Sequence, residues 1–452
     1  MNAWLARLAY STLLRLATPV FLARLWWRGS REPAYREGLA QRLGFGRGRP
    51  PAPGCVWLHA VSLGETRAAA PLVDALRTQQ PGLRLLLTHG TATGLAAGCT
   101  MLREGDTQTW LPYDTPGAVR RFLRHHRPAL GVVMETEIWP NLLFEARAAG
   151  VPLVLANARL STRSQRKGEQ LAALMHPAMQ CFAQVLAQTE ADAQRLRASG
   201  AVQVQVVGNL KFDMAPKPEQ LARGRAWAAA LGRPVVMAAA TREGEETQLL
   251  VAWAAALAAP LLAPLSAPLS TPSPQASMAP ASWAPQRPLL LLVPRHPQRF
   301  DDVAALVQAS GLSMARRNSW GDEPPVAAFA ADVWLGDSLG EMPLYYAASQ
   351  VALLGGSFEP LGGQNLIEAA ACGCPLVMGP HTFNFAQAAA QAIEAGAAER
   401  VPSLAEAVPR AMELATSPQR LAMSAQAGVF AAQHRGAAQR MAASIVGLLK
   451  PG

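Results

Sequence analysis

Several short stretches of the sequence carry polar residues that could do chemistry, and the first contains a single carboxylate. Residues 57–67 read WLHAVSLGETR, an apolar run followed by a Ser/Gly turn and a helical pattern that includes Glu65. At the carboxyl edge of a parallel sheet, where ligands bind, Glu65 could act as a general base on an attacking hydroxyl. The alternative is a structural Glu that complements a helix dipole. Because a helix N-terminus lowers the pKa of a carboxylate, a base at this position requires desolvation on substrate binding to raise the pKa again.

Two carboxylates, Glu135 and Glu137, follow another apolar run in the stretch METEIWPN at residues 134–141. At a ligand-binding edge they would contact substrate or support acid–base chemistry, whereas elsewhere they would be solvated surface residues. A metal pair is only weakly indicated, because no nearby His or third carboxylate completes a ligand set. We therefore predict no metal site.

Two basic stretches could neutralise charge on a ligand. Residues 157–161 read NARLS and residues 208–211 read GNLK, which places Arg159 and Lys211 after apolar runs. A cation at a strand exit can balance phosphate or carboxylate charge as it develops, although isolated surface cations are equally common. In PRHPQRF, residues 294–300, two prolines fix a turn that would present Arg295 and His296, which could also be ordinary loop residues.

The strongest signal is a pair of glycine turns. Gly355-Gly356-Ser357 follows an apolar run, and residues 362–368, GGQNLIE, lead into a helical pattern. Glycines allow the backbone to approach a ligand, and a helix N-terminus favours phosphate, so the pattern indicates nucleotide binding with Glu368 on the ribose hydroxyls. The structural alternative is a helix cap formed by Asn365. The stretch is neither a P-loop nor a dinucleotide fingerprint.

The elements that position these stretches are short apolar strands alternating with helical patterns, which predicts an α/β protein with parallel sheets covered on both faces. The sequence APKP at residues 215–218 predicts a boundary between domains 31–215 and 216–452, facing a cleft. An Ala/Pro/Ser tract at 254–288 is expected to be a disordered surface insertion. The predicted strands are 55–60, 83–88, 130–134, 152–156, 185–188, 202–207, 235–239, 289–293, 351–354 and 375–378.

Composition supports a folded protein with more than one core. The chain has 452 residues, of which 50% are hydrophobic and 16% charged, so it is not a polar disordered chain. Five scattered cysteines are too few for a disulfide framework and indicate a reducing compartment. The formal net charge is +10, and the first 50 residues hold nine Arg and two Glu, an excess of seven positive charges. This uneven distribution favours an anionic membrane surface as a partner over nucleic acid.

The N-terminal segment is predicted to be a membrane-associated helix, within residues 1–30. Residues 4–27 are apolar and aromatic, but Arg7, Arg15 and Arg24 interrupt them. The longest uncharged part, residues 16–23, is much shorter than the ~20 residues that span a bilayer. Such a helix could span the membrane, lie in the interface with its Arg side chains at the phosphates, or pack on the body of the protein.

Taken together, these stretches resemble the 3-deoxy-D-manno-octulosonic acid (Kdo) transferase family of bacterial lipopolysaccharide synthesis. The motifs that carry the resemblance are, in order, HAVSLGE, METEIWPN, NARLS, GNLKFD, PRHPQRF, LGDSLGEM and GGQNLIE. The resemblance implies two Rossmann-like domains in the GT-B arrangement, a membrane anchor and a cytoplasmic catalytic body. It implies that the first domain receives the lipid A precursor and the second holds CMP-Kdo, at the cytoplasmic face of the inner membrane, without a cofactor.

The family motifs also imply roles for individual residues. Glu65 matches the proton acceptor, and Glu135 and Lys211 match positions that stabilise the transition state. Ala240-Thr241-Arg242 departs from the usual Ser-Thr-His, and Leu339 replaces a common Met. The residues that match CMP-binding positions are Arg295, His296, Leu339, Gly340, Glu341, Asn365, Leu366, Ile367 and Glu368.

The reaction expected from this resemblance is displacement of CMP at the anomeric carbon of Kdo by a glucosamine hydroxyl of the precursor (lipid IVA). Two alternatives differ in class: another GT-B enzyme that uses a different nucleotide sugar on a lipid, and a non-enzymatic sugar-binding protein. The second would need an exported chain, and no cleavable signal follows the apolar N-terminal segment.

Overall fold

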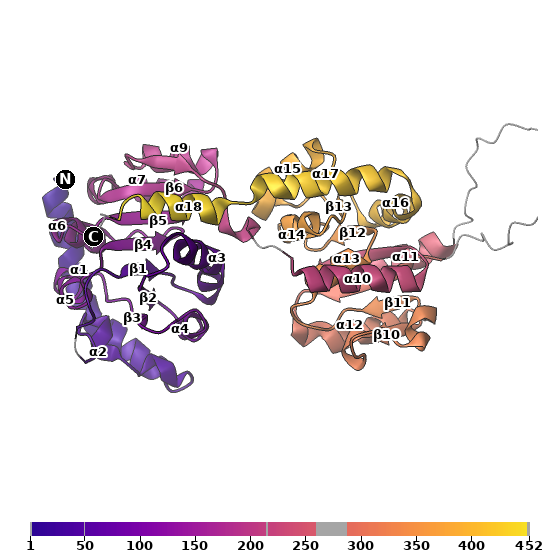
Figure 1. Ribbon diagram of the computed structural model, residues 1–452, viewed down its shortest axis with the longest axis horizontal. Coiled ribbons are helices and arrows are strands. Elements are labelled where there is room, and N and C mark those ends of the chain that lie inside the picture. The colour runs from indigo at the N-terminus through magenta and orange to yellow at the C-terminus, as the bar shows by residue number, and fades with distance from the viewer. Residues whose placement is uncertain (1, 49, 214–215, 259–286, 450–452) are drawn as a thin grey trace, which may run out of the picture. The chain divides into compact units, whose positions relative to one another are not determined.

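A computed structural model describes residues 2–48, 50–213, 216–258 and 287–449. The chain divides into two compact units (Figure 1), unit 1 with residues 1–214 and 434–452 and unit 2 with residues 215–433. Each unit contains one wholly parallel seven-stranded sheet with helices around it. The prediction of two α/β domains with parallel sheets is therefore confirmed.

The sheet of unit 1 has the strand order β3-β2-β1-β4-β5-β6-β7. Its central strands are fully buried because helices cover both faces, which is why they read as continuous apolar runs. The order reverses between β1 and β4, and such a switch point is where an open parallel sheet binds ligands. The strands are β1 (Val56–His59), β2 (Leu85–His89), β3 (Thr107–Trp110), β4 (Leu130–Met134), β5 (Leu153–Ala158), β6 (Phe182–Ala187) and β7 (Val204–Val206).

The helices of unit 1 begin mostly at the carboxyl ends of these strands. Ser62, Thr91, Ser161 and Thr189 cap four of them through their hydroxyl groups, as expected for helix N-termini. The helices are α1 (Ala3–Arg28), α2 (Leu39–Arg42), α3 (Leu63–Gln79), α4 (Ala92–Cys99), α5 (Pro116–His126), α6 (Pro140–Ala148), α7 (Thr162–Glu169), α8 (Ala172–Met179), α9 (Glu190–Ala198) and α18 (Ala437–Val446).

The sheet of unit 2 has the order β10-β11-β9-β8-β12-β13-β14, and its switch point lies between β8 and β12. The strands are β8 (Val235–Thr241), β9 (Leu289–Pro294), β10 (Met314–Arg316), β11 (Val333–Leu335), β12 (Val351–Leu354), β13 (Leu376–Met378) and β14 (Ala398–Arg400). The helices are α10 (Pro218–Leu231), α11 (Glu245–Ala258), α12 (Phe300–Ala309), α13 (Met342–Ala348), α14 (Leu366–Ala371), α15 (Ala386–Glu394), α16 (Leu404–Thr416) and α17 (Gln419–His434).

The structure departs from the sequence prediction at three places. Strands β3, β10, β11 and β14 were not predicted, since each has only three or four residues and three of them mix polar with apolar ones. Residues 254–258 of the expected insertion belong to helix α11, and residues 259–286 lie outside the described residues. The C-terminal residues 434–452 belong to unit 1 and not to the second domain.

Helix α18 packs on unit 1, although the sequence analysis assigned residues 216–452 to one domain. Figure 1 shows this helix, in yellow, among the indigo and magenta elements of unit 1. Its apolar side chains Met441 and Ile445 are buried in the same core as Leu72 and Leu76 of α3. Burial of this apolar face explains why the chain returns to the first unit.

The N-terminal segment forms helix α1 as predicted. One face contacts α6 and α8, whereas the other exposes large apolar side chains, including Leu16 at 73% and Trp27 at 80% of their surface. Among the described residues, no helix has the length and apolar character needed to cross a membrane.

Candidate functional site

Three carboxylates lie together at the switch point of unit 1, and we call them the acidic cluster: Glu65, Glu135 and Glu137. Glu65 follows β1 at the start of α3, and Glu135 and Glu137 follow β4. Burial is the largest cause of the raised pKa of both Glu65 and Glu137. Their charges also affect one another, because Glu135 raises the pKa of Glu65, and Glu65 and Glu135 both raise the pKa of Glu137. The sequence prediction that these carboxylates share the ligand edge of the sheet agrees with this geometry.

Glu65 takes part in a reciprocal cap at the start of α3. Its backbone N–H donates to the Ser62 hydroxyl, which in turn donates to the Glu65 carboxylate at 3.1 Å. The backbone N–H of Val61 donates to the other carboxylate oxygen at 2.9 Å. Glu65 thus lies in the first turn of α3, where the structural alternative of a Glu that complements the helix dipole also places it. A carboxylate has about four acceptor positions, so these two bonds leave Glu65 able to accept a proton from a ligand.

The pKa of Glu65 is raised above its usual value of 4.5, and burial is the largest cause. The bonds from Val61 and Ser62 and the charge of Lys211 act in the opposite direction, but burial prevails. The sequence analysis expected this desolvation only on substrate binding. The fold itself supplies it, because the Glu65 side chain is already half-buried in the structure.

Residues 135–139, which we call the acid loop, have an unusual backbone. Glu135 has φ +56°, in the left-handed region that non-glycine residues rarely adopt, and its N–H donates to the Ala156 carbonyl at 2.9 Å. The Glu137 carboxylate accepts a bond from the indole N–H of Trp139 at 2.9 Å. Strain of this kind persists only where the surroundings enforce it, and it clusters at functional sites.

Lys211 is the cation that reaches the acidic cluster. It lies in a short 3-10 helix, Leu210–Phe212, whose start is fixed by the buried Asn157, since the Leu210 N–H donates to its Oδ1 at 3.1 Å. The charge of Lys211 lowers the pKa of Glu65, which places the two groups close to each other. From the NARLS stretch it is Asn157, not the exposed Arg159, that supports the site.

Unit 2 gathers basic side chains at the carboxyl edge of its sheet, in what we call the basic cluster: Arg242, Arg295 and His296. Arg242 follows β8, and the other two follow the adjacent strand β9. Partial burial and the charges of Arg242, Arg295 and Arg299 lower the pKa of His296. Arg299 is neutralised by the buried Glu246 at 2.7 Å, whereas Arg242 and Arg295 form no ion pair within the described residues.

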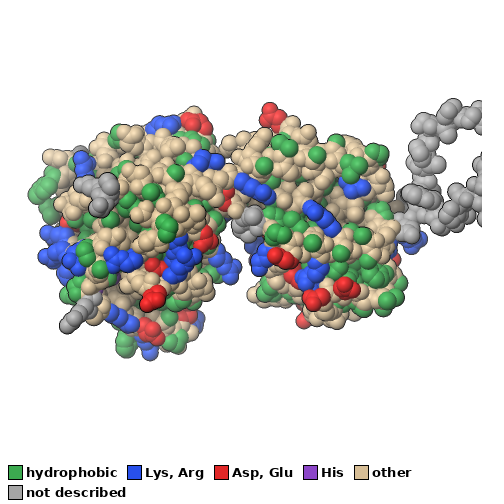
Figure 2. All heavy atoms as spheres, viewed as in Figure 1, with side chains coloured by type: hydrophobic (Ala, Val, Ile, Leu, Met, Phe, Trp, Pro, Cys, Tyr) green, Lys and Arg blue, Asp and Glu red, His purple; other side chains and the backbone are tan. Residues whose placement is uncertain are grey.

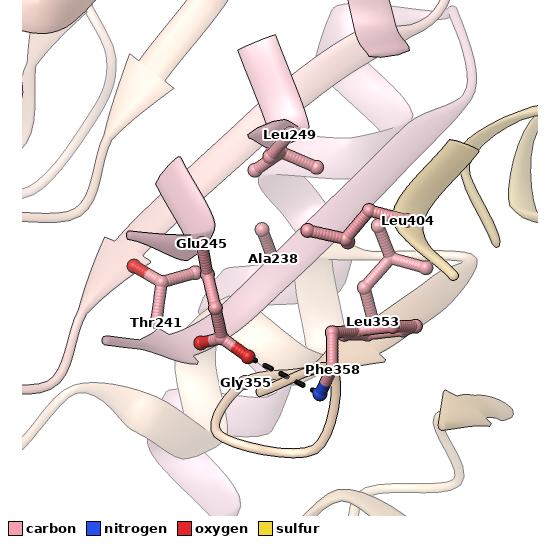
Figure 3. Close-up of a pocket in the computed structure, with 8 residues that line it drawn as sticks. All are labelled: Ala238, Thr241, Glu245, Leu249, Leu353, Gly355, Phe358 and Leu404. Atoms are coloured by element: carbon pink, nitrogen blue, oxygen red, sulfur yellow. Dashed lines mark hydrogen bonds between the residues drawn. The ribbon is translucent and has the colours of Figure 1, made fainter. Parts of the chain in front are cut away.

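The glycine turn after β12 approaches β8 closely. A Cβ on Gly355 would lie 2.5 Å from the Ala240 carbonyl oxygen, so only glycine fits. The buried carboxylate of Glu245 fastens this turn to the Arg242 loop, because it accepts bonds from the N–H groups of Arg242 at 2.9 Å and Gly356 at 2.8 Å. Figure 3 shows the same carboxylate directed at the backbone nitrogen of Phe358, the third donor.

The cavity drawn in Figure 3 is not the ligand site. Its volume is about 10 Å³, room for a single water, and its lining includes Leu249, Leu353 and Leu404. Glu245 lines the same cavity, and its carboxylate holds the Gly355–Ser357 turn through the Gly356 N–H.

The stretch around α14 places Glu368 beside the basic cluster. Asn365 caps α14 by accepting from the Ile367 N–H at 3.2 Å, as the structural alternative predicted, and Gln364 accepts from Arg295 Nε at 3.2 Å. The Glu368 side chain does not share in that cap: within the described residues its carboxylate accepts no hydrogen bond, although its backbone carbonyl accepts the Cys372 N–H. Burial raises its pKa and Arg295 opposes the change. The side chains of Leu366 and Ile367 belong to the core.

The turn at Leu339, Gly340 and Glu341 follows β11, which pairs with β9, so it lies at the same edge as Arg295. The Leu339 side chain is 75% exposed. Glu341 forms ion pairs with Arg223 at 2.7 Å and Arg317 at 2.8 Å. Burial by itself would raise the pKa of Glu341, but the bonds from Ser338 and Arg317 outweigh burial and lower this pKa below 4.5. Its carboxylate thus fixes the turn instead of facing outward.

Sequence reasoning missed the residues that support the site from within. Arg242 was noted only as a departure from a motif, and Glu245, Glu246 and the buried His89, which bonds the Ala60 carbonyl at 2.9 Å, were not selected. The acidic residues of TREGEE immediately after a strand were a usable signal. Within the described ranges, no three His, Cys, Asp or Glu side chains are arranged to hold a metal ion.

Comparison with known proteins gives consistent matches. A family model described as 3-deoxy-D-manno-octulosonic-acid transferase (kdotransferase) matches residues 37–214. The 3-deoxy-D-manno-octulosonic acid transferase of Bordetella pertussis is 49% identical over 406 residues, covering 88% of this chain and 89% of that protein. The enzyme of the same name from Haemophilus influenzae is 33% identical over 407 residues, covering 88% of both chains.

Among solved structures, a glycosyltransferase from Rickettsia africae superimposes with a TM-score of 0.55, covering 88% of this chain and all of that one. Its identity is 11%, so the likeness concerns the fold alone. That fold agrees with the expected GT-B class.

Proposed function

Since the chain belongs to the Kdo transferase family and is a glycosyltransferase of lipopolysaccharide biosynthesis, we propose that it transfers Kdo from CMP-Kdo to the lipid A precursor lipid IVA. The observation that carries the proposal is the placement of Glu65 at the switch point of unit 1 with a raised pKa. This is the position and the protonation behaviour that a general base requires.

The donor is proposed to bind unit 2. CMP-Kdo carries one phosphodiester and one carboxylate, and Arg242 and Arg295, which form no ion pair within the described residues, provide positive charge for them. Glu368, whose carboxylate accepts no hydrogen bond within the described residues, is a suitable acceptor for ribose hydroxyls. The Gly355–Ser357 turn lets the backbone approach the nucleotide.

The reaction is proposed to proceed by direct displacement. Glu65 accepts the proton of a glucosamine hydroxyl, the hydroxyl oxygen forms a bond to the anomeric carbon of Kdo, and the bond from that carbon to the phosphate oxygen of CMP breaks with its electron pair on CMP. Lys211 balances negative charge near Glu65, and burial together with the smaller effect of Glu135 keeps the pKa of Glu65 raised. Arg295 offsets the charge of the departing phosphate.

One incubation tests the proposal. The purified protein is mixed with CMP-Kdo and tetraacylated lipid A precursor, and the products are analysed by mass spectrometry. We expect precursor masses increased by one or more Kdo residues together with release of CMP. An unchanged precursor, or stabilisation by UDP but not by CMP in a thermal-shift comparison, would contradict the assigned substrates.

We further propose that the protein binds the cytoplasmic face of the inner membrane through α1. The exposed face of the helix carries Leu13, Leu16, Val20 and Trp27, each at least 65% exposed. Figure 2 shows patches of Lys and Arg side chains on the visible face of unit 1, which suit anionic lipid. Flotation with phosphatidylglycerol vesicles is expected for the wild type and reduced for Leu16→Glu with Val20→Glu. Equal flotation of both proteins would contradict this mode of binding.

A further inference from the structure

The contact between α1 and the rest of unit 1 is unusually polar for a buried surface. Ser11 and Asn141 are 4% and 0% exposed, and the Ser11 hydroxyl donates to Asn141 Oδ1 at 3.0 Å. Arg7 Nε donates to the same oxygen at 3.3 Å, and the Tyr10 hydroxyl donates to Asp114 Oδ2 at 2.9 Å. Buried hydrogen bonds are directional, so they fix the position of a helix where apolar contacts would let it slide.

Of the two residues that receive these bonds, Asn141 lies at the start of α6, and Asp114, which precedes α5, caps the start of α6. Asp114 accepts the N–H groups of Asn141 at 3.1 Å and Leu142 at 2.6 Å, and the Asn141 side-chain amide donates to the Asp114 carbonyl at 2.8 Å. Asn141 is therefore bonded on both sides: to Asp114 within the body of unit 1 and to Ser11 and Arg7 of α1. None of these groups contacts the acidic cluster directly.

The acid loop ends where α6 begins, only two residues before Asn141. At its other end, the Glu135 N–H is bonded to Ala156 of the neighbouring strand. The loop is thus fastened at two points, and the left-handed conformation of Glu135 depends on both, because such a conformation is retained only when the surroundings enforce it.

We propose that Asn141 is a positioning residue for the transfer reaction and that docked α1, through Ser11 and Arg7, holds it and with it the acid loop in place. The inference rests on the proposed function, since it assigns the acid loop a part in that reaction. It gives α1 a role in catalysis that is separate from membrane attachment. Undocking α1 removes one of the two sets of bonds that hold Asn141, so that this end of the acid loop is held less firmly and Glu135 can move relative to Glu65.

The test uses the full-length protein in detergent with the variant Tyr10→Phe/Ser11→Ala, which removes two bonds from α1 and leaves the Asp114–Asn141 bonds intact. The control is Thr18→Ala on the same helix, because the Thr18 hydroxyl bonds only the Leu14 carbonyl of its own helix, at 2.7 Å. Ser11→Thr keeps the hydroxyl and serves as the rescue. Hydrogen exchange of amides 135–142 reports docking, and kinetics report function.

We expect faster exchange of those amides and a kcat about tenfold lower in the double variant, with KM for CMP-Kdo unchanged. Glu65 is faced by Glu135, Glu137 and Lys211. Because Glu135 raises its pKa, displacement of Glu135 is expected to move the acidic limb of the kcat/KM profile to lower pH. The control and the rescue should behave like the wild type.

Three results would overturn the inference: an unchanged kcat and pH profile in the double variant, with or without faster exchange; an equal loss in Thr18→Ala; or a loss confined to KM. If the wild type transfers no Kdo, the proposed function fails instead. In that case unchanged exchange in the double variant would still refute the claim that α1 holds the acid loop.

Discussion

The Ser62 hydroxyl accepts the backbone N–H of Glu65 and donates to its carboxylate at 3.1 Å, so one pair of residues both starts helix α3 and orients the proposed base. A carboxylate held in this way presents its remaining lone pairs in a fixed direction, which lowers the reorganisation needed at the moment of proton transfer. The cap and the base are therefore two uses of the same side chain.

Replacing the base separates these two uses. Glu65→Gln retains an oxygen for the Val61 N–H and so keeps the helix start, but it cannot accept a proton. We expect turnover to fall by ~10²–10⁴-fold while CMP affinity stays unchanged. Initial rates and calorimetric titration with CMP measure both. The exposed Glu104→Gln in the same unit is the matched control; full activity of Glu65→Gln would remove Glu65 from the mechanism.

The pH dependence of kcat/KM should follow the charges around Glu65. The base must be ionised and its pKa lies above 4.5, so activity is lost as pH falls through that raised pKa. Lys211 lowers this pKa and Glu135 raises it. The acidic limb should therefore move to higher pH in Lys211→Met and to lower pH in Glu135→Gln. Shifts in the same direction in both variants would contradict the arrangement.

Arg295 should contribute to nucleotide affinity. Arg295, a member of the basic cluster, forms no ion pair within the described residues. Its charge nevertheless acts on the nearby Glu368. We expect Arg295→Met to weaken CMP binding about tenfold or more, since a charge-assisted hydrogen bond contributes about 1.5–3 kcal/mol. The exposed Arg225→Met is the control. The difference between the two variants should diminish at high salt; equal affinity at low salt would exclude Arg295 from the site.

Glu245 should stabilise unit 2 without touching the ligand. Its carboxylate accepts three backbone N–H groups, from Arg242, Gly356 and Phe358, and is 1% exposed. In Glu245→Gln the side-chain NH₂ group takes the place of one carboxylate oxygen and faces a backbone N–H. At least one buried backbone N–H then loses its acceptor. We expect the free energy of unfolding to drop by about 1–3 kcal/mol, measured by urea denaturation. The control is Glu243→Gln at an exposed position, which should leave the free energy of unfolding unchanged. An unchanged free energy of unfolding in Glu245→Gln as well would contradict the prediction.

Much of the site could be predicted from local order along the chain. Glu135, Arg295 and Gly355 each follow an apolar strand directly, and Glu65 lies in the first turn of the helix after β1. Within each sheet, parallel strands bring their carboxyl ends to one edge. What could not be predicted is how each side chain is used. Glu341 matched a ligand-binding motif, yet it is engaged by Arg223 and Arg317, which lie 118 and 24 residues away in the sequence.

The sequence by itself determined the parallel α/β architecture, the family and the residues at the strand exits. These follow from the alternation of apolar runs with helical patterns, from the turn residues and from the order of the motifs, all of which can be read along the chain. Only the tertiary structure decided that α18 returns to unit 1, that burial raises the pKa of Glu65, and that Ser11 meets Asn141 across 130 residues. These outcomes depend on which segments, distant in the sequence, pack against one another and bury their surfaces from water. Desolvation and buried hydrogen bonds arise from that packing, and no single stretch of sequence contains it.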